Sequence, residues 1–188
     1  MKLILASKSP RRREILGSLG VDFEIIPAVG DEVVEQVNEK DIAMNIAKAK
    51  AEEIFEKYPD CAVIGADTIV VLNGEILQKP IDEKDAYDML TKLSGKTHVV
   101  YTGYAFLTKD TKICGAEASF VTFNELSEQT KRDYVASGLC MDKAGAYGIQ
   151  DGYGLVKEIN GSYTNIVGFP KEVFERILKE HGFIKTAL

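Results

Sequence analysis

Two hairpin signals constrain the fold of this 188-residue chain more than any other feature. The first is Asn73-Gly74, which separates the apolar strand candidates 68–72 and 75–77 and is typical of a two-residue turn between antiparallel strands. The second is a short polar connection between two long strand candidates, 99–108 and 113–123. Because strands and helices do not alternate strictly, we expect an α/β fold built on a long mixed sheet with flanking helices.

Apolar runs and capping residues predict the remaining elements. Strands are expected at 2–6, 23–27, 61–65 and 156–159. Ser9, Asp82 and Ser127 are placed to cap helices. Apolar residues at helical spacing, together with these caps, predict helices at 10–19, 41–58, 83–93, 128–137 and 170–181. No clear linker or internal repeat interrupts this series.

Composition argues against several classes of protein. Hydrophobic residues make up 45% of the chain, enough for a core, and the formal net charge is −6. An acidic chain is a poor general binder of nucleic acid or anionic membrane, so a polyanion would need a local basic pocket. Cys61, Cys114 and Cys140 form no CxxC pair, which weakens zinc-site and disulfide interpretations. No apolar stretch is long enough to span a membrane, and we expect a cytoplasmic protein with reduced thiols.

Three arginines, Arg11–Arg13, occupy the first turn of the helix expected to begin at Pro10. The amino end of a helix carries partial positive charge and unpartnered N–H groups, so further cations there favour the binding of an anion. The cluster also follows an apolar strand, where ligands bind in α/β sheets, and guanidinium groups match phosphate oxygens. We interpret it as a phosphate site. The alternative is a solvated basic patch paired with Glu14 or Asp22.

Asp67 follows the expected buried strand 61–65, in the sequence Gly65-Ala66-Asp67-Thr68. A carboxylate in that position could hold Mg²⁺ or orient a water molecule. The alternative is an aspartate whose side chain bonds its own turn.

Two lysines are further candidate phosphate ligands. Lys79 precedes Pro80, which restricts the backbone around it, and the alternative is an exposed edge lysine. Lys50 lies in an Ala-Lys repeat, 47–51, whose small residues would let a ligand approach closely. The alternative is that the repeat simply forms a good helix.

The segment 142–150 has the sequence Asp-Lys-Ala-Gly-Ala-Tyr-Gly-Ile-Gln. It combines small alanine and glycine residues with the amide side chain of Gln150. Glutamine both donates and accepts hydrogen bonds, so it can bind the edge of a nucleotide base. The alternative is a turn-rich connector.

Several common enzyme motifs are absent from the sequence. It contains no GxxxxGK[ST], GxGxxG, HExxH or GxSxG, which counts against P-loop, Rossmann, zinc-protease and α/β-hydrolase interpretations. Several cations, the acids Glu32 and Asp67 and a base-binding loop remain. This set suits the hydrolysis of a nucleotide polyphosphate.

The order of these motifs resembles that of the Maf family of nucleoside triphosphate pyrophosphatases, also called septum-formation-like proteins. The matching segments are 5–12, 50–51, 65–70, 79–80, 93–98, 142–150 and 160–163. The resemblance implies one catalytic domain over residues 1–188, with an elongated two-lobed α/β mixed-sheet fold similar to inosine triphosphatase and a cleft between the lobes. It also implies hydrolysis of a nucleoside triphosphate to monophosphate and pyrophosphate with Mg²⁺ or Mn²⁺.

The resemblance further implies roles for individual residues. The functional positions of the family map to Ser7, Arg11, Arg12, Glu32, Lys50, Asp67, Lys79 and Gln150. Asp67 would be the catalytic residue and would hold the metal with Glu32. Arg11, Thr68 and Gln150 match the pyrimidine-specific branch, so the expected substrates are dTTP and UTP, with modified pyrimidine nucleotides as further candidates. Arg13 receives no role.

Two other functions stay open. A cell-division or septum regulator acting through protein or nucleic-acid contacts could use the arginine cluster, although the acidic net charge argues against it. A phosphotransferase would pass a phosphoryl group to an acceptor other than water. For the hydrolase we expect a nucleoside triphosphate as ligand, no membrane and no stable nucleic-acid binding, and a homodimer is an open possibility.

Overall fold

The computed structural model describes residues 1–30 and 38–185, so Glu32 lies outside the described residues. The α-helices are α1 (Pro10–Gly17), α2 (Glu39–Lys57), α3 (Glu83–Leu93), α4 (Glu128–Ala136), α5 (Tyr163–Val167) and α6 (Lys171–Glu180). The strands are β1 (Leu3–Leu5), β2 (Glu24–Ile25), β3 (Ala62–Leu72), β4 (Glu75–Leu77), β5 (Thr97–Leu107), β6 (Lys112–Phe123) and β7 (Val156–Asn160), and Ala144–Ala146 (η1) and Ile149–Asp151 (η2) are short 3₁₀ turns.

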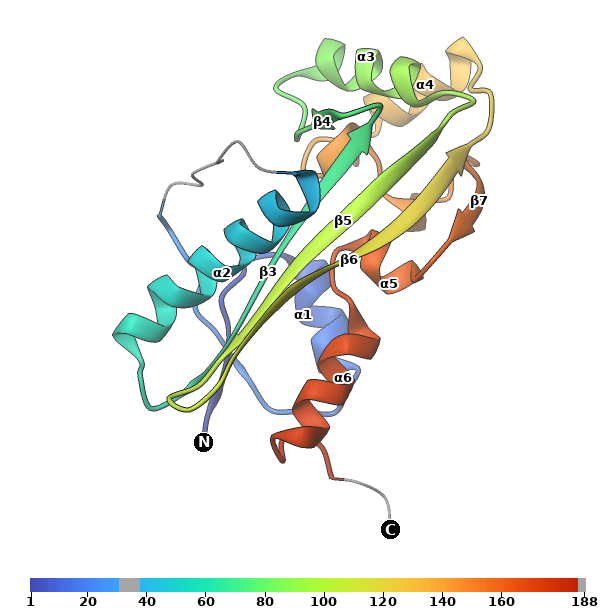
Figure 1. Ribbon diagram of the computed structural model, residues 1–188. Coiled ribbons are helices and arrows are strands. Elements are labelled where there is room, and N and C mark those ends of the chain that lie inside the picture. Colours follow the sequence, from blue (N-terminus) through green and yellow to red (C-terminus); the bar gives the residue numbers. More distant parts are fainter. Residues whose placement is uncertain (31–37, 186–188) are drawn as a thin grey trace. The chain divides into compact units, whose positions relative to one another are not determined.

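The strands of the described residues form one mixed sheet in the order β2-β1-β3-β5-β6-β7, with β4 paired to β3 (Figure 1). β1 runs parallel to β2 and β3, whereas β4 is antiparallel to β3 and β7 is antiparallel to β6. Asn73 and Gly74 join β3 to β4 with φ angles of 51° and 81°, the left-handed values that a tight hairpin turn requires. The predicted α/β mixed sheet is confirmed.

Helix caps account for most helix starts. The side chains of Ser9, Asp82 and Ser127 accept hydrogen bonds from the backbone N–H three residues later, in α1, α3 and α4, as the sequence predicts. In α2 the cap is Asn38, which accepts from Asp41 N at 3.0 Å. The helix therefore begins at Glu39, two residues before the expected start.

β3 corrects one prediction. The sequence predicts two strands, 61–65 and 68–72, but the structure has a single strand, Ala62–Leu72, and Asp67 lies inside it. A Cβ added at Gly65 would lie 2.2 Å from the backbone oxygen of Ala47. Gly65 therefore marks a close approach of α2 to the strand and does not end the strand.

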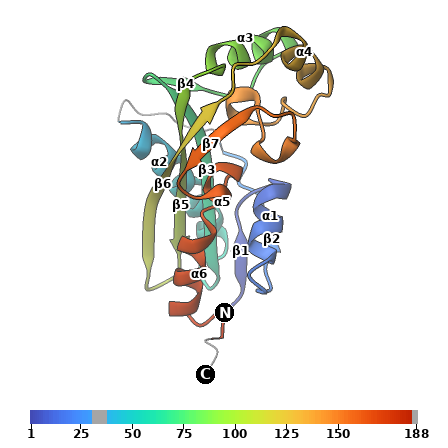
Figure 2. The same cartoon turned by 90° about the vertical axis from the view of Figure 1, so that its right-hand side faces the viewer.

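The chain divides into two compact units, which are described separately. The first unit comprises Met1–Asp67, Thr102–Glu117 and Gly168–Leu188, and the second comprises Thr68–Tyr101 and Ala118–Val167. In the first unit β1 is buried on both faces: Leu3 and Leu5 pack with residues of α1 and α6, and Ile4 and Ala6 pack with residues of α2. Successive strand residues point to opposite faces, so α2 covers one face and α1 and α6 cover the other (Figures 1 and 2).

The core of the second unit lies between strands and the helices α3 and α4. Leu90 and Leu93 of α3 and Tyr134 of α4 are fully buried. They pack with Val121 and Phe123 of β6 in one apolar cluster. The cluster also includes Tyr147 from the segment 142–150, which fixes that segment to the core.

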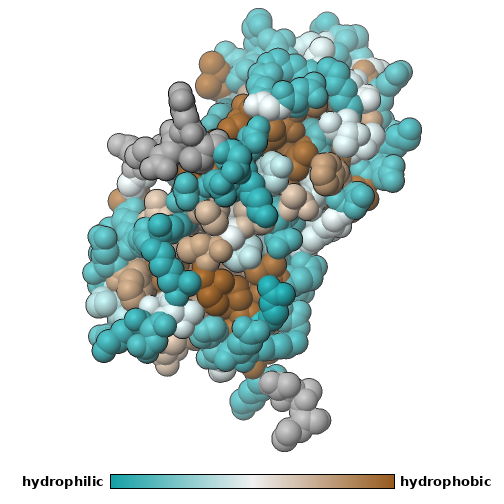
Figure 3. Space-filling model, in the orientation of Figure 1, coloured by the Kyte–Doolittle hydropathy of each residue, from teal (hydrophilic) through white to brown (hydrophobic). Residues whose placement is uncertain are grey.

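Most residues on the face shown in Figure 3 are hydrophilic, and apolar ones appear in separate patches. Exposed large apolar side chains include Val29, Ile81 and Phe120, and isolated ones are normal on protein surfaces. Within the described ranges, no helix combines the length and the apolar character needed to cross a membrane.

Candidate functional site

The first site feature is a fixed arginine at the amino end of α1. Nη1 of Arg12 donates to Oγ of Ser7 at 3.1 Å, and Nε of Arg12 donates to the backbone oxygen of Gly168 at 2.9 Å. Ser7 is buried, Arg12 and Arg11 are half-buried, and Arg13 is exposed. The guanidinium group of Arg12 is thus held by residues before α1 and before α6, at a helix end that favours anions.

The second feature is an ion pair between α2 and β3. Nζ of Lys50 lies 2.7 Å from Oδ1 of Asp67, and the two side chains are 21% and 11% exposed. The helix can bring Lys50 this close because Ala47 and Ala51 are fully buried against the sheet, where Gly65 has no side chain. A shielded pair interacts more strongly than one on the surface. The structure therefore places a cation directly beside the candidate catalytic carboxylate.

The second unit carries the other predicted residues. Thr68 is half-buried in β3, Lys79 is exposed after β4, and Gln150 is exposed in the turn η2. The backbone N–H of Gly145 donates to the backbone oxygen of Gln78 at 3.1 Å. The segment 142–150 therefore lies against the residue preceding Lys79, and the structure brings these two predicted elements together.

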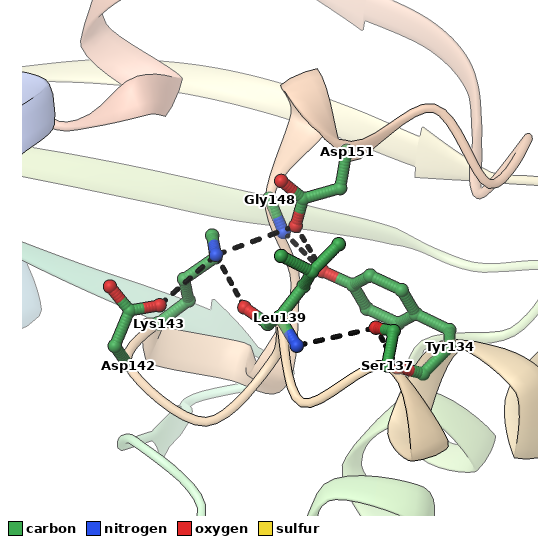
Figure 4. A network of polar contacts seen from close by, with 7 residues as sticks. All are labelled: Tyr134, Ser137, Leu139, Asp142, Lys143, Gly148 and Asp151. Atoms are coloured by element: carbon green, nitrogen blue, oxygen red, sulfur yellow. Dashed lines mark hydrogen bonds and ion pairs between the residues drawn. The ribbon is translucent and has the colours of Figure 1, made fainter.

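A polar network that the sequence did not predict supports the segment 142–150 (Figure 4). The hydroxyl of Tyr134 donates to Oδ2 of Asp151 at 2.5 Å and accepts from the backbone N–H of Gly148 at 2.9 Å. Nζ of Lys143 lies 3.0 Å from Oδ1 of Asp142 and 3.5 Å from Oδ2 of Asp151. Burial raises the pKa of Tyr134, and the hydrogen bond to Asp151 raises it further. Tyr134 is therefore a neutral hydrogen-bond donor at neutral pH.

His98 and Tyr147 anchor the same segment to β5. A hydrogen bond of 2.7 Å joins Nε2 of His98 to the hydroxyl of Tyr147, and both side chains are buried. Burial lowers the pKa of His98 to about 4 and raises the pKa of Tyr147. His98 is therefore uncharged at neutral pH, and the pair is a neutral structural contact.

The described residues fit a metal ion only if the substrate supplies some of its ligands. Among them, no group of three or more His, Cys, Asp or Glu side chains could hold a metal by itself. Mg²⁺ in nucleotide enzymes is commonly bound by one or two carboxylates together with substrate phosphates and water. The buried carboxylate of Asp67 fits such a shared ion.

Cys61, Cys114 and Cys140 form no disulfide bond with one another. Cys140 is buried, and burial raises the pKa of its thiol. Since the thiolate is the reactive form, Cys140 is a poor nucleophile.

Comparison with known proteins shows the family and the fold of the chain. A family model described as "Maf-like protein" matches residues 2–181. A dTTP/UTP pyrophosphatase of Thermococcus kodakarensis is 46% identical over 183 residues, which cover 96% of this chain and 97% of that protein. A dTTP/UTP pyrophosphatase of Bacillus thuringiensis subsp. konkukian is 46% identical over 187 residues, 98% of each chain. The Staphylococcus aureus Ham1 protein has a similar fold, with a TM-score of 0.54 at 15% identity over 96% of this chain and 100% of that one.

Proposed function

Because the chain belongs to the Maf family, we propose that it hydrolyses dTTP and UTP to the nucleoside monophosphate and pyrophosphate, as one catalytic domain over residues 1–188. The observation that carries the proposal is the shielded pair of Lys50 and Asp67, 2.7 Å apart. This pair places a carboxylate that can act on water beside a cation that can bind phosphate. Relatives at 46% identity with the same named activity support the choice of substrate.

Cationic side chains bind the triphosphate. Arg11, Arg12, Lys50 and Lys79 together offset its negative charge. Arg12 is already oriented by its bonds to Ser7 and Gly168, so little side-chain freedom is lost when it meets a phosphate oxygen. The amino end of α1 adds partial positive charge at the same place.

Asp67 carries out the proton transfer. Its carboxylate orients a water molecule towards the α-phosphorus and accepts a proton as the water attacks, and pyrophosphate leaves in line. Lys50 balances the charge of Asp67 before substrate binds and meets developing phosphate charge afterwards. A divalent cation, Mg²⁺ or Mn²⁺, supplies further charge neutralisation when bound, and Asp67 and Glu32 are the residues that would hold it.

Gln150 recognises the nucleotide base. The edge of uracil or thymine presents both carbonyl oxygens and an N–H group, and one amide side chain can pair with both kinds. Thr68 is a second candidate contact, and Arg11, Thr68 and Gln150 together fit the pyrimidine branch of the family. A site that relies on such hydrogen bonds disfavours bases that leave its polar groups unpaired.

The test is product identification with a matched pair of variants. Purified protein is incubated with each NTP and dNTP, including modified pyrimidine nucleotides and methylated GTP, in the presence of Mg²⁺. We expect pyrophosphate and monophosphate from dTTP and UTP, and a fall in kcat of about 10²–10⁴-fold in Asp67→Asn with an unchanged circular dichroism spectrum. Asp60→Asn, at an exposed position before β3, is the control and should keep wild-type activity.

Other outcomes identify the alternatives. Release of orthophosphate, or transfer to an added acceptor, would indicate a phosphatase or phosphotransferase. No turnover of any nucleotide would favour a regulator that acts by binding. Near wild-type activity of Asp67→Asn would remove the catalytic assignment of Asp67.

A further inference from the structure

We propose that Tyr134, Lys143 and Asp151 are positioning residues, whose network holds Gln150 in the orientation that selects pyrimidine nucleotides. The inference rests on the proposed function, because it deepens the role of Gln150 in that function. None of the three is among the site residues that the sequence predicts, although Lys143 lies within the segment 142–150.

The network binds residues on both sides of Gln150 in the sequence. Gly148 precedes it by two residues and Asp151 follows it directly, and both are bound by the one hydroxyl group of Tyr134. Since Tyr134 is fully buried in α4, its hydroxyl is a fixed point. The backbone of Gln150 is therefore tied to the core of the second unit, while its side chain is exposed.

Side chains of the network pack closely around the backbone of Gly148. A Cβ added at Gly148 would lie 2.6 Å from Oδ2 of Asp151 and 2.6 Å from Cε of Lys143. The Lys143 and Asp151 side chains thus close directly over the backbone of Gly148. A displacement of this backbone towards them would require both side chains to move as well.

The charged side chains of the network are buried, where an unpaired charge would be most destabilising. The side chains of Lys143 and Asp151 are only 9% and 8% exposed. A buried ion pair is weak evidence for stability, because desolvation offsets much of the attraction. A fully bonded buried network does, however, fix one geometry, and a recognition residue needs a fixed geometry. We therefore assign the network to the precision of Gln150.

Tyr134→Phe tests the assignment with little change in volume. It removes the hydrogen bond to Asp151 and the acceptor for Gly148 N. We expect KM for dTTP to rise roughly tenfold with kcat almost unchanged, and the ratio of kcat/KM for dTTP to that for dGTP to fall by the same factor. Tyr87→Phe is the matched control, because Tyr87 also donates to a carboxylate, that of Glu128, in the same unit. It should leave the ratio unchanged.

A double-mutant cycle separates positioning from a general structural effect. Gln150→Ala should itself lower the dTTP/dGTP ratio, and adding Tyr134→Phe to it should lower the ratio no further. An equal fall in both backgrounds would overturn the inference, because the effect would not pass through Gln150. If Tyr134→Phe does not fold, as judged by thermal unfolding, Asp151→Asn is measured in the same cycle with the same expectations.

The failure of this inference differs from the failure of the proposed function. If Gln150→Ala loses selectivity but Tyr134→Phe keeps the wild-type ratio, only the inference is overturned. If Gln150→Ala keeps the wild-type ratio, the base-reading role of Gln150 and the inference are both wrong. If the wild-type protein does not turn over dTTP, the proposed function fails and the inference fails with it.

Discussion

The close packing of α2 on β3 predicts that Gly65→Ala will lower both stability and activity. A Cβ at Gly65 would lie 2.2 Å from the backbone oxygen of Ala47 and 3.0 Å from Cβ of Ala51. A backbone oxygen cannot turn aside as a flexible side chain can. The helix must therefore move away from the strand by roughly 1 Å to restore normal contact distances.

Both expected magnitudes follow from this displacement. Overpacking of a well-packed core costs about 1–3 kcal/mol, so we expect the free energy of unfolding to fall by about 2 kcal/mol. For a chain of this size that corresponds to a decrease in Tm of roughly 4–8 °C. Because Lys50 moves with α2 and Asp67 stays with β3, dTTP turnover should fall by up to about 10²-fold, as expected for a 1 Å misplacement near the reaction.

Urea unfolding followed by circular dichroism measures the first effect, and pyrophosphate release measures the second. Gly17→Ala is the control, since a Cβ there would lie 4.0 Å from Cε1 of Phe23 and alanine favours the helix. The control should be as stable as the wild type or more stable, with unchanged activity. Wild-type stability and turnover in Gly65→Ala would refute the proposed link between helix packing and the ion pair.

Two further predictions concern α1 and β5. Arg12→Ala should lower the free energy of unfolding by about 2 kcal/mol, because it removes charged hydrogen bonds to Ser7 and Gly168, and it should raise KM for dTTP. Urea unfolding and the pyrophosphate assay measure the two effects. The exposed control Arg13→Ala should change neither. Burial lowers the pKa of His98 from 6.5 to about 4, so the unfolded chain binds the proton more readily between these values. The free energy of unfolding should therefore fall by up to about 3 kcal/mol as the pH decreases from 6.5 to 4. In urea unfolding at several pH values, His98→Gln should flatten that part of the profile. An unchanged slope in the variant would contradict the role given to His98.

Local signals predicted most elements of the fold. Caps, tight turns and apolar periodicity act within a few residues, and α3 lies at the predicted 83–93. The pattern Gly65-Ala66-Asp67-Thr68 predicts the end of a strand, but β3 continues through these residues. The glycine is needed there because the backbone of α2 lies against it, and that contact is not local in the sequence.

The sequence predicts candidate site residues one by one but not the contacts between them. Lys50 and Asp67 are separated by 17 positions, and no spacing rule joins a helix residue to a strand residue over that distance. Tyr134 and Asp151 are likewise 17 positions apart, and neither belongs to a motif with a chemical role. Their partnership depends on how α4 packs beside the segment 142–150, which only the folded chain specifies.

The Ala-Lys repeat around Lys50 shows how packing and function meet. Its small residues allowed two interpretations, close approach of a ligand or simple helix formation. In the structure Ala47 and Ala51, four positions apart, face the sheet and set the distance between α2 and β3. Lys50 stands beside that face, and its long side chain reaches Asp67 only because the helix lies so close. The alanines are therefore determinants of the candidate active site, although neither is expected to touch a substrate.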